Sequence, residues 1–530
     1  MRVRPTRNIL PEPRFFNKEF RIFLISTVFS ASPAKKSAPS CRHTVSKVYY
    51  KIDTTGRSNI SGGAALKTMH TSGNTKIIRD YTQGPLFGNL LAFSIPFMIS
   101  NALQVIYSVV DMIVVGKVVG KEALVGVANG SQIITMLSLA CTGLSAGGQV
   151  YISQLLGSGR RDRLNRVLGS FFSLKLLLGA VIALLVMTTA APCMILLRTP
   201  AESLGHAETY MRINSLGLFF TFGYGMFAAA MRGLGDSKHP LAFIILSSMM
   251  NLALDVWFVT FLDWGVAGAA WATVISQFTK FVVSWIFLYR RRKDLGFDFK
   301  WSSWRIDWGV AGGILKLGIP FAIRYGMIHF SMLFVHANVN ALGGDYAAAF
   351  HVGLRCDSTV ANISSGILTG ASGIIGQNYG ARKFDRIGVT IRYAWLISAA
   401  MYAVYTACLV CFPRQMFGCF GLEGHALGLA PIFVSAILWQ FPAMVLTRGT
   451  TAFVHGIGNV WLAFAFAMLD AFLLRILLSW LFGGMIFTDS PEDRLYGYIL
   501  GYGLASYGMA LPGLFYYFFC PWRKRKLVTE

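Results

Sequence analysis

Long apolar segments separated by short polar connections run through the chain from Leu86 to Cys520. A helix needs about 20 mostly apolar residues to cross a bilayer, and we count twelve segments of this kind. They include residues 176–197, 241–262, 265–289, 391–412, 458–485 and 495–520. A transmembrane β-barrel would instead show alternating segments of about ten residues. The pattern predicts an all-α polytopic membrane protein with twelve transmembrane helices.

The composition agrees with this pattern. Of the 530 residues, 54% are hydrophobic and 14% are charged, and the mean hydropathy is +0.53. A soluble chain of this length, with two or three domains, would carry more charge. The eight cysteines do not have the spacing of a metal site or of a disulfide framework. We therefore expect no cofactor apart from a coupling ion.

The net charge of +24 is distributed unevenly along the chain. Clusters of Arg and Lys follow every second predicted span, at residues 160–166, 290–293, 382–386 and 523–526. The positive-inside rule places these connections, and both termini, in the cytoplasm. The charge thus indicates the topology of a protein in the plasma (inner) membrane, and we expect no nucleic-acid partner.

Residues 1–68 form a basic, mostly polar region with 13 of the 48 Lys and Arg residues. Its apolar run from Phe20 to Phe29 is too short to span a bilayer. A targeting segment fits this composition, and so does a disordered or spurious extension ahead of a start near Met69. We favour the extension and expect no function in residues 1–80.

The two halves of the chain repeat each other. Five positions carry the same residue at an offset of 223: Gly143/Gly366, Gln154/Gln377, Gly157/Gly380, Gly233/Gly456 and Gly235/Gly458. Pro96 matches Pro320 at an offset of 224. Because each half holds an even number of spans, both enter the membrane in the same orientation. This parallel repeat predicts two six-helix lobes related by a pseudo-two-fold axis along the membrane normal.

The repeat also predicts the division of the chain. We expect a first lobe at residues 81–292, a cytoplasmic linker at 293–310, a second lobe at 311–522 and a basic cytoplasmic tail at 523–530. Pro96 lies inside the first span, where a proline kinks a helix. It is either a bending element or a packing feature.

Two acids lie far from the ends of their predicted spans, Asp111 in the first span and Asp255 in the fifth. Tyr107 and Asn251 each precede one of them by four residues, and so lie on the same helix face. Thr273 of the sixth span adds a hydroxyl group. Ionisable residues inside a membrane are costly and by default functional.

These five side chains could form one cation-coupling site. Oxygen donors suit a hard cation such as Na⁺, and two neighbouring carboxylates in a low dielectric also accept a proton easily. The site could therefore take Na⁺ or H⁺. The alternative is that each acid only caps or bridges neighbouring helices.

The second half lacks these acids. Asp111 corresponds to Val335 at the offset of 224. At the offset of 223, Asn251 and Asp255 correspond to Leu474 and Leu478. Other polar groups in the second-half spans are His336, Asn338, Asn340, Arg355, Asp357 and Arg475.

We interpret Arg355 and Asp357, two of these second-half groups, as a structural pair or a helix-end feature. His336 is a packing residue rather than a pH-sensitive group.

From about Gly84 to Lys526 the chain resembles the multidrug and toxic compound extrusion (MATE) family. The resemblance rests on the segments IPFMISNALQVIYSVVDMIVVG, QLLGSGRRDRL, AAAMRGLGDSKHP, MMNLALDVWFV, GVAGAAWATVISQ and GASGIIGQNYGARKFDR. It implies twelve helices in two lobes and export of cationic or amphipathic drugs in exchange for Na⁺ or H⁺. The family's first-lobe cation site maps onto Tyr107, Asp111, Asn251, Asp255 and Thr273, and its bending proline onto Pro96.

The chain departs from one branch of that family in the seventh span. That branch carries a membrane-embedded Glu where this sequence has Ile328. The sequence is therefore nearer to the DNA-damage-inducible and Gram-positive-like branch.

These observations predict a monomeric antiporter rather than an enzyme. A flippase for lipid-linked oligosaccharide or peptidoglycan precursors is the alternative, although it should have extra helices and a strongly cationic cavity. A membrane enzyme would need an acid/base pair, a nucleophile or a metal set, and the sequence shows none. A polytopic receptor would usually have neither duplicated halves nor an acid pair.

Overall fold

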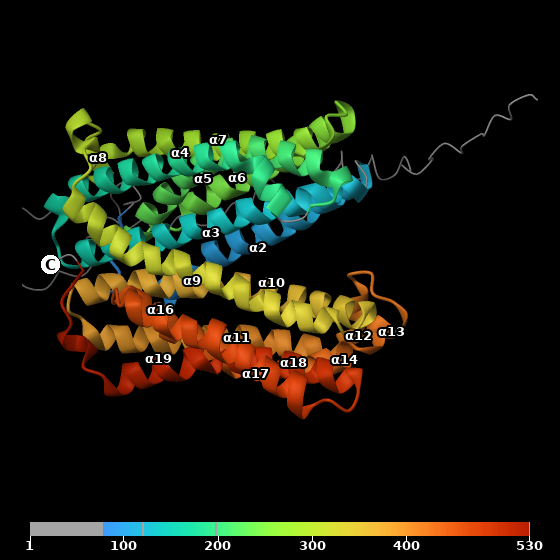
Figure 1. Ribbon diagram of the computed structural model, residues 1–530. Coiled ribbons are helices and arrows are strands. Elements are labelled where there is room, and N and C mark those ends of the chain that lie inside the picture. Colours follow the sequence, from blue (N-terminus) through green and yellow to red (C-terminus); the bar gives the residue numbers. More distant parts are fainter. Residues whose placement is uncertain (1–77, 119–120, 197–198, 529–530) are drawn as a thin grey trace, which may run out of the picture. The chain divides into compact units, whose positions relative to one another are not determined.

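The computed structural model of the protein describes residues 78–118, 121–196 and 199–528 (Figure 1). The helices of the first lobe are α2 (Leu86–Val118), α3 (Lys121–Gly157), α4 (Leu164–Leu196), α5 (Ala201–Gly233), α6 (Lys238–Asp255) and α7 (Gly265–Arg290). The π-helical turn η2 (Val256–Phe261) continues α6 without a break. Short helical turns of the lobe are η1 (Arg161–Arg163) and, after α7, α8 (Arg292–Leu295) and η3 (Trp301–Trp304).

The second lobe repeats this order with more interruptions. Its first helices are α9 (Trp308–Asn340), α10 (Gly344–Gly380), α11 (Phe384–Cys411), α12 (Pro413–Gly418), α13 (Gly424–Gly428), α14 (Ala430–Ile437) and α15 (Gln440–Gly456). The remaining elements are α16 (Val460–Met468), the π-turn η4 (Leu469–Leu474), α17 (Arg475–Leu481), the π-turn η5 (Phe482–Ile486), α18 (Pro491–Ala505), α19 (Tyr507–Phe519) and η6 (Trp522–Lys524). The described residues contain no β-strand, which confirms the predicted all-α class.

Eight helices within the described residues are long and apolar enough to cross a membrane, or nine if α13–α14 and α15, bent by 53°, form one span. The long helices α9 and α10 and the pair α18–α19 complete two sets of six. On α10, Arg355 and Asp357 lower the apolarity, as expected for a helix that faces protein or an aqueous path rather than lipid.

The first helix of each lobe packs across to the other lobe. Helix α2 contacts α10, and α9 contacts α3. A Cβ atom at Gly366 of α10 would lie 2.5 Å from the backbone nitrogen of Met98, and one at Gly143 of α3 would lie 2.6 Å from that of Ala322. Because Gly143 and Gly366 are repeat partners, the lobe interface is itself pseudo-symmetric, with small residues that allow close helix approach.

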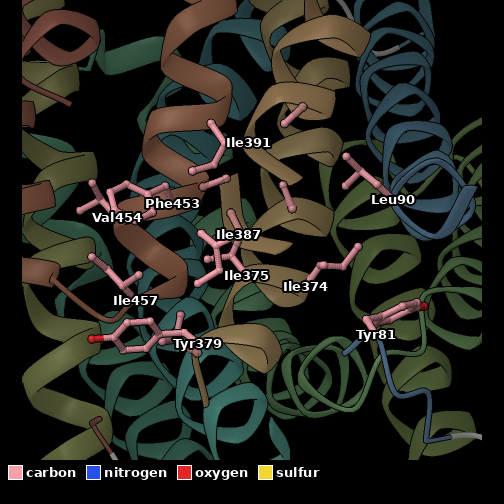
Figure 2. Close-up of a cluster of buried hydrophobic side chains, with 14 of the residues drawn as sticks. Tyr81, Leu90, Ile374, Ile375, Tyr379, Ile387, Ile391, Phe453, Val454 and Ile457 are labelled. Carbon is pink, nitrogen blue, oxygen red and sulfur yellow. The ribbon is translucent and has the colours of Figure 1, made fainter. Parts of the chain in front are cut away.

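A buried apolar cluster joins the two lobes at one end of the bundle (Figure 2). It combines Leu90 of α2 with Ile374 and Ile375 of α10, Ile387 of α11 and Phe453 of α15. Figure 2 shows Leu90 approaching Ile374 from the side opposite Phe453. The lobes therefore share a hydrophobic core at this end, where both described chain ends also lie.

The segment between the lobes is packed rather than loose. Phe297 is 1% exposed and stacks edge-on against Phe172 of α4 at 5.4 Å. Asp307 caps the N-terminus of α9, since its Oδ1 accepts hydrogen bonds from the backbone N–H groups of Gly309 and Val310. It also forms an ion pair with Arg166. The segment thus fastens α9 to the first lobe.

Candidate functional site: a buried carboxylate in the first lobe

Three of the five predicted coupling residues meet between α6 and α7. Asn251 and Asp255 are 2% and 1% exposed and lie one turn apart on α6. Nδ2 of Asn251 donates to Oδ2 of Asp255 at 2.8 Å, and Oδ1 of Asn251 accepts from the backbone N–H of Thr273 at 3.2 Å. The amide thus links the carboxylate of one helix to the backbone of the next.

The other two predicted residues, Tyr107 and Asp111, belong to α2, but their side chains lie outside the described residues. Helix α2 packs against α6, η2 and α7. The helix that carries Tyr107 and Asp111 is therefore a neighbour of the helices that carry Asn251, Asp255 and Thr273.

Pro96 lies buried within α2 at the lobe interface. Ser100, one turn later, donates a hydrogen bond from Oγ to the carbonyl oxygen of Pro96 at 2.8 Å. The residues two before and two after the proline, Ser94 and Met98, are those that approach Gly370 and Gly366 of α10. A change of bend at Pro96 would therefore alter the contact between the lobes.

The helix widens directly after Asp255. The π-turn η2 begins at Val256. Such turns occur mostly as single-turn bulges in helices and are frequent at functional sites. The carboxylate thus lies at the junction of an α-helix and a π-turn, where the regular backbone hydrogen-bond pattern changes.

The second-lobe counterpart of this helix contains one extra residue. Before the end of η4, buried residues of the two lobes correspond at an offset of 223: Pro240/Ala463 and Ser247/Asp470. After η4 they correspond at an offset of 224: Asn251/Arg475, Asp255/Ser479 and Val259/Gly483. The π-turn η4, at residues 469–474, lies where the offset changes. The match of Leu474 and Leu478 to the amide and acid was therefore wrong by one residue, and both leucines are only partly buried.

Arg475 is the true counterpart of Asn251 and reverses the charge of the site. It is 5% exposed, its Nη2 donates to Oδ1 of Asp470 at 3.1 Å, and its guanidinium lies 4.8 Å from the ring centroid of Tyr502. Where the first lobe has a carboxylate held by an amide, the second lobe has a buried ion pair.

We expect Asp470→Asn to destabilise the protein. The change leaves Arg475 buried without its charged partner, and breaking a buried pair in this way costs about 3–5 kcal/mol. Thermal unfolding of the purified protein in detergent measures the effect, with Asp489→Asn in an exposed connection as the matched control. Equal unfolding temperatures for both variants would show that the pair does not stabilise the lobe.

Arg355 and Asp357 do not form the predicted structural pair. Asp357 is 4% exposed, and its Oδ2 accepts from Nε2 of Gln440 at 3.5 Å. The charges that act on it are those of Arg448 and Arg475. Arg355, two residues earlier and within the first third of α10, is exposed on another face. His336, by contrast, packs against Phe350 and His351, as expected.

Two lysines within first-lobe helices were not predicted to matter, and one of them is buried. Lys175 of α4 is 1% exposed, and its Nζ donates to the carbonyl oxygen of Cys141 at 2.9 Å and to Oγ of Ser145 at 3.1 Å. Lys280 of α7 lies over the ring of Tyr224 at 4.6 Å. A single Lys inside each apolar run was the available signal.

Two repeat-related glutamines, Gln154 and Gln377, close the interface between the lobes at one end of the bundle. This end, which also carries Tyr81 and Val528, is here called the terminal face. Nε2 of Gln154 donates to the carbonyl oxygen of Gly456 at 2.9 Å. Nε2 of Gln377 donates to that of Gly233 at 3.3 Å. Because Gly233 and Gly456 are repeat partners, each lobe holds the other by the same contact.

Residues near both ends of the described chain take part in this closure. Oε1 of Gln377 accepts from the backbone N–H of Tyr81 at 2.9 Å, and Oε1 of Gln154 accepts from that of Val528 at 3.0 Å. The Tyr81 hydroxyl donates to the carbonyl oxygen of Gly235 at 2.9 Å, and burial raises the pKa of Tyr81 to about 12. The hydroxyl therefore stays protonated and keeps this bond.

A polar pocket of about 270 Å³ lies between the lobes, away from the terminal face. It is lined by Asn101, Gln104 and Val105 of α2 and by Arg355, Ser358, Thr359, Asn362 and Ser365 of α10. At 1.5 Å per residue, Gln104 lies about 27 Å along α2 from its start at Leu86. The lobes are thus closed at the terminal face while a pocket remains between their opposite halves.

The repeat and its two offsets agree with a comparison to known families. The family model described as MatE matches residues 96–257 and, a second time, residues 320–481. The chain belongs to the MATE family. The two matches begin and end 224 residues apart, so the lobes are two copies of one MATE unit, and the predicted resemblance is confirmed.

Curated relatives agree with this MATE assignment over most of the chain. The probable multidrug resistance protein YpnP of Bacillus subtilis is 27% identical over 85% of this chain and 99% of its own length. The multidrug export protein MepA of Staphylococcus haemolyticus is 24% identical over 61% of this chain and 71% of its own length.

Solved structures show the same fold. A multidrug resistance MATE family transporter of the MOP superfamily in an outward-facing conformation has a TM-score of 0.75 at 21% identity, covering 84% of this chain and 98% of that one. A MOP superfamily transporter from Pyrococcus furiosus has a TM-score of 0.78 at 20% identity over 86% and 100% of the two chains. This MATE chain is therefore a membrane protein with the fold of known transporters.

Proposed function

We propose that this MATE protein is an antiporter that exports cationic and amphipathic drugs in exchange for Na⁺ or H⁺. Relatives named as multidrug resistance and export proteins support the drug-export part. The buried carboxylate of Asp255, held by Asn251 next to Thr273, carries the coupling part, because a buried ionisable group in a membrane is retained at a cost.

The amide of Asn251 favours the ionised form of Asp255. Its Nδ2 donates to the carboxylate, and its Oδ1 accepts from the backbone N–H of Thr273, which fixes the orientation of the amide. A proton or cation at Asp255 would compete with the donated hydrogen bond. Asp111 and Tyr107 of α2 complete the proposed ion site.

Cation binding would be transmitted to the lobes through α2. This helix contacts α6 and α7 on one side and α10 of the second lobe on the other, and Pro96 lies at the second contact. For coupling, drug and cation must differ in their affinity for the two lobe arrangements, because equal affinity shifts nothing. The protein would act as a monomer in the plasma membrane, with its terminal face on the cytoplasmic side. Because the lobes meet at the terminal face, the arrangement described here would be closed to the cytoplasm.

Ethidium transport in everted membrane vesicles tests the proposal and decides the ion. The fluorescence change is followed under an imposed Na⁺ gradient and, separately, under an imposed pH gradient. We expect transport under one gradient above that of vesicles without the protein. Transport at the vesicle background under both gradients would contradict coupled drug export.

A further inference from the structure

Lys175 lies in the interior of the first lobe without an acidic partner. It belongs to the apolar helix α4 and is 1% exposed, and no carboxylate of the described residues accepts a hydrogen bond from it. A lysine inside a membrane span is costly and by default functional. The proposed ion site between α6 and α7 does not use this lysine, so its amine needs another explanation.

The amine of Lys175 is held against a thiol. Its Nζ donates to the carbonyl oxygen of Cys141 at 2.9 Å, to Sγ of Cys141 at 3.0 Å and to Oγ of Ser145 at 3.1 Å, all on one turn of α3. A Cβ atom at Gly225 of α5 would lie 3.1 Å from this Sγ and 3.8 Å from Nζ. The ring centroid of Phe222, on the same helix, lies 4.7 Å from Nζ. Since Cys141 is 3% exposed, nitrogen and sulfur meet in a closed and mostly apolar space.

A thiol and an amine in this arrangement become linked when the thiol is oxidised. One molecule of hydrogen peroxide converts the thiol to a sulfenic acid and is itself reduced to water. The amine, in its uncharged form, then attacks the sulfur. A sulfur–nitrogen bond forms, the sulfur–oxygen bond breaks, and the hydroxyl group leaves as a second water with a proton from the amine. Sulfenic acids condense in this way even with backbone nitrogen atoms, which are weaker nucleophiles than an amine.

We propose that Cys141 and Lys175 form a redox modification site, at which peroxide joins α3 to α4 through a reversible sulfur–nitrogen bond. The site is independent of drug export and of its coupling ion. Peroxide is uncharged and little larger than water, so it enters the packed lobe more readily than a cellular thiol does. Burial then favours the bond over further oxidation, because the amine already contacts the sulfur whereas a second peroxide molecule must first diffuse in.

The bond would fix α3 where the two lobes meet. Cys141 lies two residues before Gly143, at which a Cβ atom would lie 2.6 Å from the backbone nitrogen of Ala322 in α9. Oxidation would therefore fasten the part of α3 that packs against the second lobe to a second helix of its own lobe.

Peptide mass spectrometry of the full chain, oxidised while folded, tests the proposal. Cys141 is kept as the one remaining cysteine, so that no disulfide forms within the chain. After treatment with hydrogen peroxide the protein is unfolded and digested with trypsin, which separates residues 122–160, with Cys141, from residues 167–198, with Lys175. We expect these two peptides to be joined, with the loss of two hydrogen atoms and without cleavage after Lys175. Dithiothreitol should separate them again.

Three controls make the result specific. Protein that is unfolded before peroxide is added should give no joined peptides, because the fold alone brings the amine to the sulfur. Lys175→Met keeps an unbranched side chain of similar length and should leave Cys141 unlinked. A variant with Cys356 as the one remaining cysteine should form no bond to a lysine. Cys356 is 6% exposed and so similarly buried, but no lysine of the described residues donates a hydrogen bond to it.

Several outcomes would overturn the inference. One is a free Cys141 thiol after peroxide treatment of the folded protein, and another is Cys141 as sulfinic or sulfonic acid with trypsin still cleaving after Lys175. A bond from Cys141 to a different lysine, or joined peptides at the same yield from unfolded protein, would also contradict it. None of these results bears on ethidium transport, which tests drug export separately.

Discussion

Replacing Asp255 with Asn should reduce gradient-driven drug transport in proteoliposomes to the rate of passive leak. The asparagine keeps the size of the side chain and can still bond to Asn251, but it can neither bind a proton nor neutralise a cation. Dye binding measured without a gradient should remain, because the fold and the pocket between the lobes are preserved.

The matched control is Asp263→Asn. Asp263 lies in an exposed connection at a φ of 53°, a conformation that Asn tolerates as well as Asp does. This variant should transport at the wild-type rate. Undiminished gradient-driven transport by Asp255→Asn would show that Asp255 only supports the packing of α6 against α7.

Adding one methyl group at Gly157 should open the terminal face. A Cβ atom there would lie 2.0 Å from the carbonyl oxygen of Gln377, and one at the repeat partner Gly380 would lie 2.3 Å from that of Gln154. Both obstacles are backbone atoms, so no side-chain rotation relieves the clash. Overpacking of this kind costs about 1–3 kcal/mol, which raises the open population by about 5- to 150-fold.

Maleimide labelling of a buried cysteine measures this opening. Ser153 of α3 is 0% exposed and faces Gly376 of α10, so Ser153→Cys in a cysteine-free background reacts only when the lobes separate there. The labelling rate should rise in Gly157→Ala and stay unchanged in Gly312→Ala, where a Cβ atom meets nothing within 4 Å. Equal rates in the two variants would mean that the terminal face does not restrain the lobes.

The sequence was sufficient to predict the features that follow from a regular pattern along the chain. Apolar runs predicted the helices, and the constant offset predicted two lobes. Spacing by one turn correctly placed Asn251 beside Asp255, because the geometry of an α-helix fixes that relation. The contact of Asn251 with Thr273 needed only that α7 follow α6 through a short connection.

Other features depend on contacts between distant segments. The hydrogen bonds of Gln154 and Gln377 join residues 302 and 144 positions apart, and nothing in their local sequence marks the acceptor. The pair Arg475 and Asp470 was missed for a different reason. The π-turn was not visible in the pattern of apolar residues, so we applied the offset of 223 to the whole helix. That offset paired Asn251 with Leu474 instead of with Arg475.

The π-turn η4 also shows how a duplicated membrane protein can accept an insertion inside a span. One additional residue in a regular helix would rotate everything beyond it by about 100°, turning buried positions toward lipid. Here the widened turn takes up the rotation, and Ser479 and Gly483 keep the buried positions that Asp255 and Val259 occupy in the first lobe. An alignment of the two lobes therefore needs a gap within a transmembrane helix, because a gap-free comparison pairs Asn251 with Leu474 instead of with the buried Arg475.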